Sequence, residues 1–182
     1  MLYIKGISNS PFAKLYKRSL LANIRFTEGI TIAEDLEMNY KLLLSADMVV
    51  LCHVKLYHYL QRRGSAMNSQ FNKARMDGLR ITEVMYEDSK KYSIQISKAT
   101  ENRLFMEAIF TAIEIPCRAS LYREERHECT TTIRKLRKNV LFDSESKLKH
   151  RCYALMSLIS VRLLIILFRI KRSVDSTLRN AT

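Results

Sequence analysis

Two adjacent carboxylates, Glu34 and Asp35, are the side chains with the clearest potential for chemistry. Thr31, followed three residues later by Glu34, fits a capping box, in which a threonine and a glutamate satisfy the first free N–H groups of a helix. Carboxylates at a helix N-terminus are also stabilised by the helix dipole, which is a purely structural explanation for the pair. A positioned aspartate can instead act as a general base towards a hydroxyl within hydrogen-bond reach.

A basic turn follows further along the chain, at Arg62-Arg63-Gly64-Ser65. Guanidinium groups bind phosphate oxygens in pairs, and a glycine lets backbone N–H groups approach an anion. Upstream, residues 12–18 mix aromatic and basic side chains, including Lys14. Taken alone, each segment also fits an exposed turn or an amphipathic helix start with solvated lysines.

The order of four short blocks resembles the bacterial-type family-2 glycosyltransferases. The blocks are residues 12–21 (Phe-Ala-Lys-Leu-Tyr-Lys-Arg-Ser-Leu-Leu), 24–29 (Ile-Arg-Phe-Thr-Glu-Gly), 34–36 (Glu-Asp-Leu) and 57–67 (Tyr-His-Tyr to Arg-Gly-Ser-Ala-Met). One departure is mild: Phe12 stands where the family commonly has tryptophan. Leu60 and Arg63 stand where related sequences often carry an arginine and an acidic residue, which makes the match of the donor loop less specific.

The resemblance implies a role for each matching residue. Asp35 would deprotonate the acceptor hydroxyl, and Glu34 would cap the helix and orient its neighbour. The implied reaction transfers a sugar from a nucleotide-sugar to a glycan or lipid-linked acceptor in surface polysaccharide assembly, by single displacement with inversion. The donor- or acceptor-binding positions carried over are Lys14, Arg62, Gly64 and Ser65.

The resemblance does not extend to the N-terminal half of these enzymes, which binds the nucleotide-sugar and carries an Asp-x-Asp motif for the metal. No Asp-x-Asp sequence occurs in the chain. We therefore expect no metal site and no cofactor in this chain, and expect Mg²⁺ or Mn²⁺ only with the missing half, to neutralise the leaving diphosphate. The sequence predicts a chain that is inactive alone, with a separate N-terminal half as a possible partner.

The resemblance and the local patterns together predict an α/β fold. Residues 1–70 would form part of a GT-A-type catalytic core with few strands, namely Met48–Cys52 and Leu56–Leu60, which are short apolar runs. Residues 71–182 would form a helical extension, because glycine and proline are scarce. Predicted helices with the side chains expected on one face are one after Glu34 (Leu36, Tyr40, Leu43, Leu44), 71–91 (Leu79, Thr82, Tyr86), 98–115 (Phe105, Ala108, Ile109, Ala112, Ile113) and 121–139.

The C-terminal part is basic and ends in an apolar segment. Residues 118–172 contain 14 Lys and Arg against 5 Asp and Glu, within a chain whose net charge is +13. Residues 153–170 are long enough to suggest a transmembrane helix, but Arg162 would cost about 2.5–3.5 kcal/mol at the bilayer centre. A helix lying on an anionic membrane surface fits better, and packing on the protein's own core is the open alternative. With no signal-peptide-like start, we expect a cytoplasmic protein at the inner face of the cell membrane.

Two other classes of function remain open. A basic helical nucleic-acid-binding module would explain the charge but not the series from Glu34 to Ser65, so we expect no nucleic-acid partner. A non-catalytic peripheral membrane protein would use only residues 153–170.

The cysteines do not predict a metal site. Structural zinc sites need closely spaced ligand pairs, whereas the four cysteines lie far apart, so reduced thiols are expected. The run His127-Glu128-Cys129 is not expected to bind metal either. The cysteines are Cys52, Cys117, Cys129 and Cys152.

Overall fold

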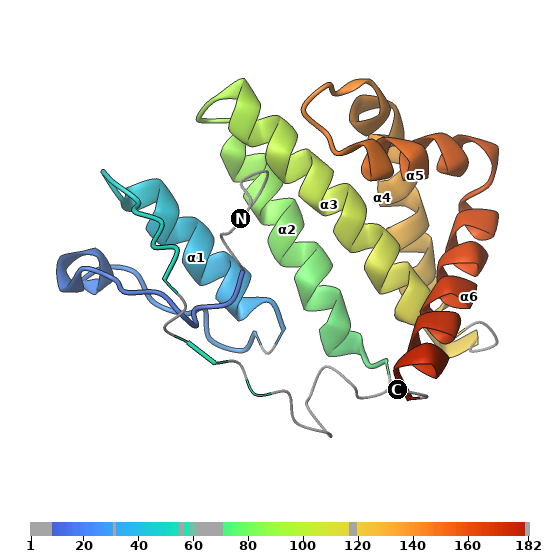
Figure 1. Cartoon of the computed structure of the whole chain (residues 1–182). Coiled ribbons are helices and arrows are strands. Elements are labelled where there is room, and N and C mark those ends of the chain that lie inside the picture. Colours follow the sequence, from blue (N-terminus) through green and yellow to red (C-terminus); the bar gives the residue numbers. More distant parts are fainter. Residues whose placement is uncertain are drawn as a thin grey trace.

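The chain folds into helices that pack side by side (Figure 1). The computed structural model describes residues 9–30, 32–54, 57–58, 60, 71–116 and 120–180, with side chains as far as Arg172. The α-helices are α1 (Glu34–Ser45), α2 (Met76–Ser89), α3 (Ile94–Glu114), α4 (Arg123–Phe142), α5 (Leu148–Ile159) and α6 (Val161–Asn180), and the short 3-10 helices are η1 (Arg18–Leu21), η3 (Lys73–Arg75) and η4 (Ser120–Tyr122).

The predicted α/β fold is wrong, because the described residues contain no strand and no sheet. Met48–Cys52 leaves α1 without regular structure, and its Met48 and Val50 side chains are 79% and 77% exposed. A strand needs a neighbour to accept and donate its backbone hydrogen bonds, and the described part of the chain offers none. In the second predicted strand, Leu56–Leu60, positions 56 and 59 lie outside the described residues.

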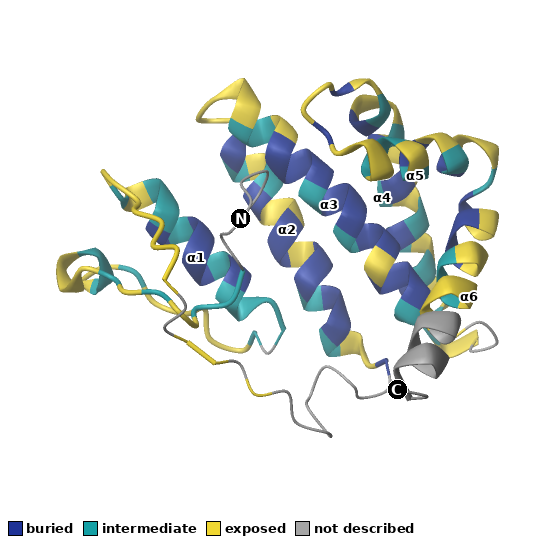
Figure 2. Ribbon diagram, in the orientation of Figure 1, coloured by how far each residue is buried: buried dark blue, intermediate teal, exposed yellow. Residues whose placement is uncertain are grey.

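Helix α3 forms the centre of the core, and it packs against α2, α4 and α6. The predicted apolar stripe along this helix is confirmed, since Phe105, Ala108 and Ile109 are fully buried and Ala112 and Ile113 nearly so. The helix ends at Glu114, two residues before Pro116, a residue that cannot continue a helix. Figure 2 shows many buried residues along α2 and α3.

Helix α1 packs against α2 through a second, smaller apolar cluster. Leu36 and Tyr40 of α1 contact Ile81 and Met85 of α2. The Tyr40 hydroxyl also donates a hydrogen bond to a carboxylate oxygen of Asp88, at 3.1 Å. This contact positions the start of α1, and with it Glu34 and Asp35, relative to the helical core.

The predicted helix over residues 153–170 is two helices that meet at Ser160. The backbone of Ser160 is extended (φ −158°, ψ 119°), which ends α5, and its hydroxyl accepts a hydrogen bond from the Leu163 N–H in the first turn of α6. Ala154, Val161 and Leu164 are buried in the core, so one face of this region packs on the protein itself. Within the described residues, no helix combines the length and the apolar character needed to cross a membrane.

Arg169 ties α6 to the end of α3. Its guanidinium group donates to the carbonyl oxygens of Ala112 (3.0 Å), Ile113 (2.9 Å) and Ile115. The last carbonyls of a helix have no partner within the helix, so these bonds satisfy groups that burial would otherwise leave unpaired.

A series of hydrogen bonds between side chains stabilises the turn between α4 and α5. A ring nitrogen of His150, Nδ1, lies 2.7 Å from the Asn102 side-chain oxygen, and the Asn102 amide donates to the Ser146 hydroxyl. That hydroxyl donates to Asp143 at 2.8 Å. Burial, followed by the positive charges of Lys149 and Lys147, lowers the pKa of His150 to about 4. The ring is therefore neutral in the folded protein at neutral pH.

This lowered pKa makes the stability of the protein depend on pH. Below pH 6.5 the unfolded chain binds a proton at His150 that the folded protein does not bind until about pH 4, so acid favours unfolding in that interval. We expect a loss on the order of 2 kcal/mol, since one pKa unit corresponds to about 1.4 kcal/mol and the ring is only half-buried. As the pH is lowered through this interval, the unfolding temperature of His150→Gln should fall less than that of the original protein. The unfolding temperature of the control His53→Gln, at an exposed position, should fall as much as that of the original protein. An unchanged pH dependence in His150→Gln would contradict this assignment.

Candidate functional site

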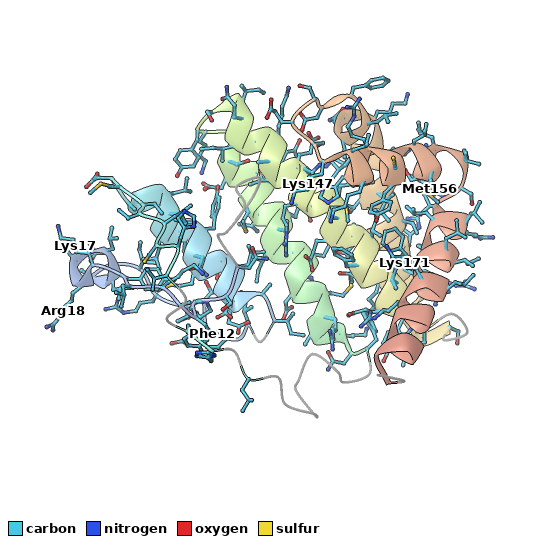
Figure 3. All side chains as sticks on the ribbon, viewed as in Figure 1. Phe12, Lys17, Arg18, Lys147, Met156 and Lys171 are labelled. Atoms are coloured by element: carbon cyan, nitrogen blue, oxygen red, sulfur yellow. The ribbon has the colours of Figure 1, made fainter. Side chains whose placement is uncertain are left out.

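The first two blocks of the sequence contact helix α1, which begins with the third block, and the fourth block contacts the first. Phe12 of the first block stacks on Tyr57 of the fourth, with ring centroids 6.0 Å apart and planes 7° apart. The Thr27 hydroxyl, in the second block, donates to the Glu37 carboxylate of α1 at 2.9 Å. Phe12 is labelled beside α1 in Figure 3. Phe12 and Tyr57 thus meet although they are 45 residues apart, and the second block contacts the helix that carries Glu34 and Asp35.

Tyr16 and Asn39 make the direct contact between the first block and α1. The Tyr16 hydroxyl donates to the side-chain oxygen of Asn39 at 2.5 Å, and the Asn39 amide donates to the carbonyl of Asn9. Asn39 is 2% exposed and lies one helical turn after Asp35, on the same face. This contact fixes the segment that carries Lys14 against the face of α1 that carries Asp35.

The predicted capping box is wrong. Ala33, not Thr31, is the N-cap residue of α1, and no side chain accepts a hydrogen bond there. Glu34 is therefore the first residue of the helix, where it can interact with the helix dipole but cannot cap in the predicted way. Thr31 lies outside the described residues.

Two alanines beside the candidate site have a left-handed backbone. Ala13, next to Lys14, has φ 56°, and Ala33, next to Glu34, has φ 69°. For a residue with a Cβ this conformation costs about 1–2 kcal/mol, and such strained residues are concentrated at functional sites. Gly29 also has a positive φ, of 80°, which explains why the second block ends in glycine.

The surroundings of Asp35 raise the pKa of its carboxyl group. Partial burial, followed by the negative charge of Glu34, raises the pKa of Asp35, and the nearby Lys14 ammonium group opposes this. Partial burial in turn lowers the pKa of Lys14, while Asp35 raises it. Burial and the Asp35 charge also raise the pKa of Tyr16. Lys14 and Tyr16 therefore each interact electrostatically with Asp35.

Such an arrangement can accept a proton from a bound hydroxyl. Asp35 supplies the carboxylate, Lys14 offers a cation for a polar or anionic acceptor group, and Phe12 with Tyr57 offers two aromatic rings that are about half exposed. Arg62, Gly64 and Ser65, the predicted residues of the donor loop, lie outside the described residues. The structure therefore brings together Lys14, Glu34 and Asp35.

Sequence reasoning missed Asn39 and the role of Tyr16. Asn39 lies four residues after Asp35, a spacing that places two side chains on one helix face, so the helical pattern contained a signal for it. Nothing in the sequence indicates that Tyr16 contacts Asn39, because 23 residues separate them.

The described residues contain no group of three or more His, Cys, Asp or Glu side chains arranged to hold a metal ion. Cys129 is fully buried, and burial raises the pKa of its thiol to about 12, so it is protonated and unsuited to metal binding. Cys52, Cys129 and Cys152 are free thiols, and Cys117 lies outside the described residues.

A separate hollow lies at η1, away from this site. The described residues that line it are Arg18, Ser19, Leu21, Ala22 and Arg25, and none of them belongs to the group around Asp35. The Arg25 guanidinium group is already bonded to the carbonyls of Leu21 and Ile24. Lys17 and Arg18 project outwards here (Figure 3).

In comparisons with known proteins, no family model matches the chain, and no curated protein or solved structure is significantly similar to it. The resemblance to family-2 glycosyltransferases therefore depends on the four blocks alone.

Proposed function

We propose that this chain is the acceptor-side part of a family-2-type glycosyltransferase, in which Asp35 is the general base. The observation that carries the proposal is a set of contacts among the blocks: the first two blocks bind α1 through Tyr16–Asn39 and Thr27–Glu37, and Phe12 of the first block stacks on Tyr57 of the fourth. A chance resemblance in sequence gives no reason for the blocks to contact one another beside the helix that carries the predicted base.

The proposed reaction transfers a sugar to a hydroxyl of a glycan or lipid-linked acceptor. Asp35 removes the hydroxyl proton, the acceptor oxygen bonds to the anomeric carbon of the donor, and the bond from that carbon to the nucleoside diphosphate breaks. The nucleoside diphosphate leaves with the bonding electrons, and the configuration at the sugar inverts. The raised pKa of Asp35 supports this role, because a base is most effective when its pKa lies nearer the working pH.

A companion chain supplies the donor side in this proposal. In the proposal it carries the nucleotide-binding residues and the divalent cation of the donor site. The exposed apolar segment after α1 supports the need for such a partner: Met48, Val50 and Val54 are 79%, 77% and 65% exposed. Adjacent exposed apolar side chains of this kind typically mark a contact surface. We place the assembly at the inner face of the cell membrane, where a lipid-linked acceptor would be reached.

The experiment that tests the proposal compares membranes of cells that encode the chain with membranes of cells from which its reading frame has been deleted. Radiolabelled nucleotide-sugars are added, and incorporation of label into lipid-linked or polymeric glycan is measured. We expect incorporation from at least one donor sugar to be lost on deletion and restored by a plasmid copy. Equal incorporation in both membranes, with every donor tested, would refute the proposed function.

A further inference from the structure

The outward faces of α5 and α6 carry a row of exposed apolar side chains. On α6 the spacing is i, i+3, i+4, i+7, which places four residues on one helix face, and these residues are 41–55% exposed. On α5, Leu155 and Ile159 are 53% and 79% exposed. We call this set the α5–α6 outer face: Leu155, Ile159, Leu163, Ile166, Leu167 and Ile170.

The opposite faces of the same helices are occupied by the protein core. Ala154, Ser157, Val161 and Leu164 are buried, and Arg169 is bonded to the end of α3. In Figure 2 exposed residues mark the side of α6 turned away from α3 and α4. Packing against the protein core therefore does not explain why the α5–α6 outer face is apolar.

The segment that forms this face carries basic residues, of which Arg172 is paired with Glu114 of α3. Residues 147–172 contain seven Lys and Arg and no Asp or Glu. Five of the seven are exposed, namely Lys147, Lys149, Arg162, Lys171 and Arg172. Lys147 and Lys171, near the two ends of this segment, are labelled in Figure 3.

We propose that the α5–α6 outer face binds the surface of an anionic lipid bilayer. Helices with an apolar face and basic flanks lie in the interface of such a membrane, with the apolar side chains among the acyl chains and the basic groups at the headgroups. Each basic residue near the surface strengthens binding about fivefold. Arg162 lies beside the apolar residues, and its long side chain can extend to the headgroups.

A second copy of the chain fits this face less well. In a symmetric dimer the same patch meets itself, so the basic residues of one copy would face those of the other, and the nearby Glu114 is already paired with Arg75 and Arg172. An anionic bilayer satisfies both characters, because its acyl chains accept the apolar side chains and its headgroups accept the basic ones. This docking extends the proposed function by specifying how the chain reaches a lipid-linked acceptor, but it does not involve Asp35.

The experiment is co-sedimentation of the full chain with phosphatidylglycerol–phosphatidylcholine vesicles and with pure phosphatidylcholine vesicles. We expect clear binding to the anionic vesicles, weakened by added salt, and at least about tenfold weaker binding to the neutral ones. The double variant Leu163→Asp/Ile166→Asp and the double variant Arg162→Glu/Lys171→Glu should each weaken binding at least about tenfold. Leu163 and Ile166 are 47% and 50% exposed, and Arg162 and Lys171 are exposed, so the variants should remain folded, which circular dichroism checks.

A matched control carries the same change in net charge on another helix. Arg134→Glu/Lys138→Glu alters exposed residues of α4 and should bind within about twofold of the original protein. Asp35→Asn should also bind normally, which separates this proposal from that of sugar transfer. An equal loss in the α4 control would indicate nonspecific attraction to anions and would refute the proposal.

The absence of tryptophan from the chain allows a direct readout of contact. Tryptophan introduced as Leu167→Trp should shift its emission to shorter wavelength when anionic vesicles are added, whereas Val84→Trp, at an exposed position of α2, should not. Equal shifts at both positions, no shift at Leu167→Trp, or a dimer in solution that Leu163→Asp dissociates would each overturn the assignment.

Discussion

Replacing Asp35 by asparagine lowers sugar transfer about 100-fold or more in the membrane assay, if Asp35 is the base. Asparagine has nearly the same shape but cannot accept the proton of the acceptor hydroxyl. The side chain is only partly buried, so the fold should be retained, and circular dichroism of the purified variant checks this. The activity of the original protein should rise with pH as Asp35 loses its proton, with an acidic limb above the ordinary aspartate range because its pKa is raised.

The matched control for this substitution is Asp47→Asn. Asp47 follows α1 closely in the sequence and is exposed, and it should retain full activity. A similar loss in both variants would show that the carboxylates act through charge or stability rather than chemistry. Full activity in Asp35→Asn would exclude Asp35 as the base.

Replacing Phe105 by alanine destabilises the protein by about 3–5 kcal/mol, the usual cost of removing a fully buried aromatic side chain and leaving a cavity. Phe105 is 0% exposed, at the centre of α3, in the cluster shared by α2, α4 and α6. Denaturant unfolding followed by circular dichroism measures the difference. Because a typical domain is stable by only 5–15 kcal/mol, the variant is expected to be partly unfolded at physiological temperature.

Phe110 on the same helix provides the control. Its side chain is 48% exposed, so Phe110→Ala should cost about 1 kcal/mol or less. If the two alanine variants lost equal stability, α3 would not be the central helix of the core. Both substitutions change helix propensity by the same amount, because both replace phenylalanine with alanine in α3. A difference in stability between the two variants therefore reports burial in the core.

The helices could be predicted from the sequence because their signal is local. The stripe from Phe105 to Ile113 repeats with the period of a helix, and each of its members is buried as predicted. Residues 153–170 show the limit of this signal. Their apolar pattern continues through Ser160, where the backbone nevertheless becomes extended and starts a second helix.

The predicted strand failed for a non-local reason. Met48–Cys52 has the composition of a strand, but a strand forms only when another segment pairs with it, and none of the described residues does so. The predicted N-cap of α1 was wrong because of a backbone detail: Ala33, in a left-handed conformation, is the N-cap residue in place of Thr31. Glu34 and Asp35 nevertheless lie in the first turn of α1, as predicted, because the helical spacing of the apolar side chains predicts the helix without the cap.

Reconstitution tests the division of sugar transfer between two chains most directly. Purified chain is added to membranes of cells that lack it, with radiolabelled nucleotide-sugars, with and without Mn²⁺, and incorporation is compared with that of the chain alone. We expect incorporation only when chain and membranes are combined and the metal is present. Transfer by the purified chain alone would show that it holds its own donor site, and no transfer by the combination would contradict a role in sugar transfer.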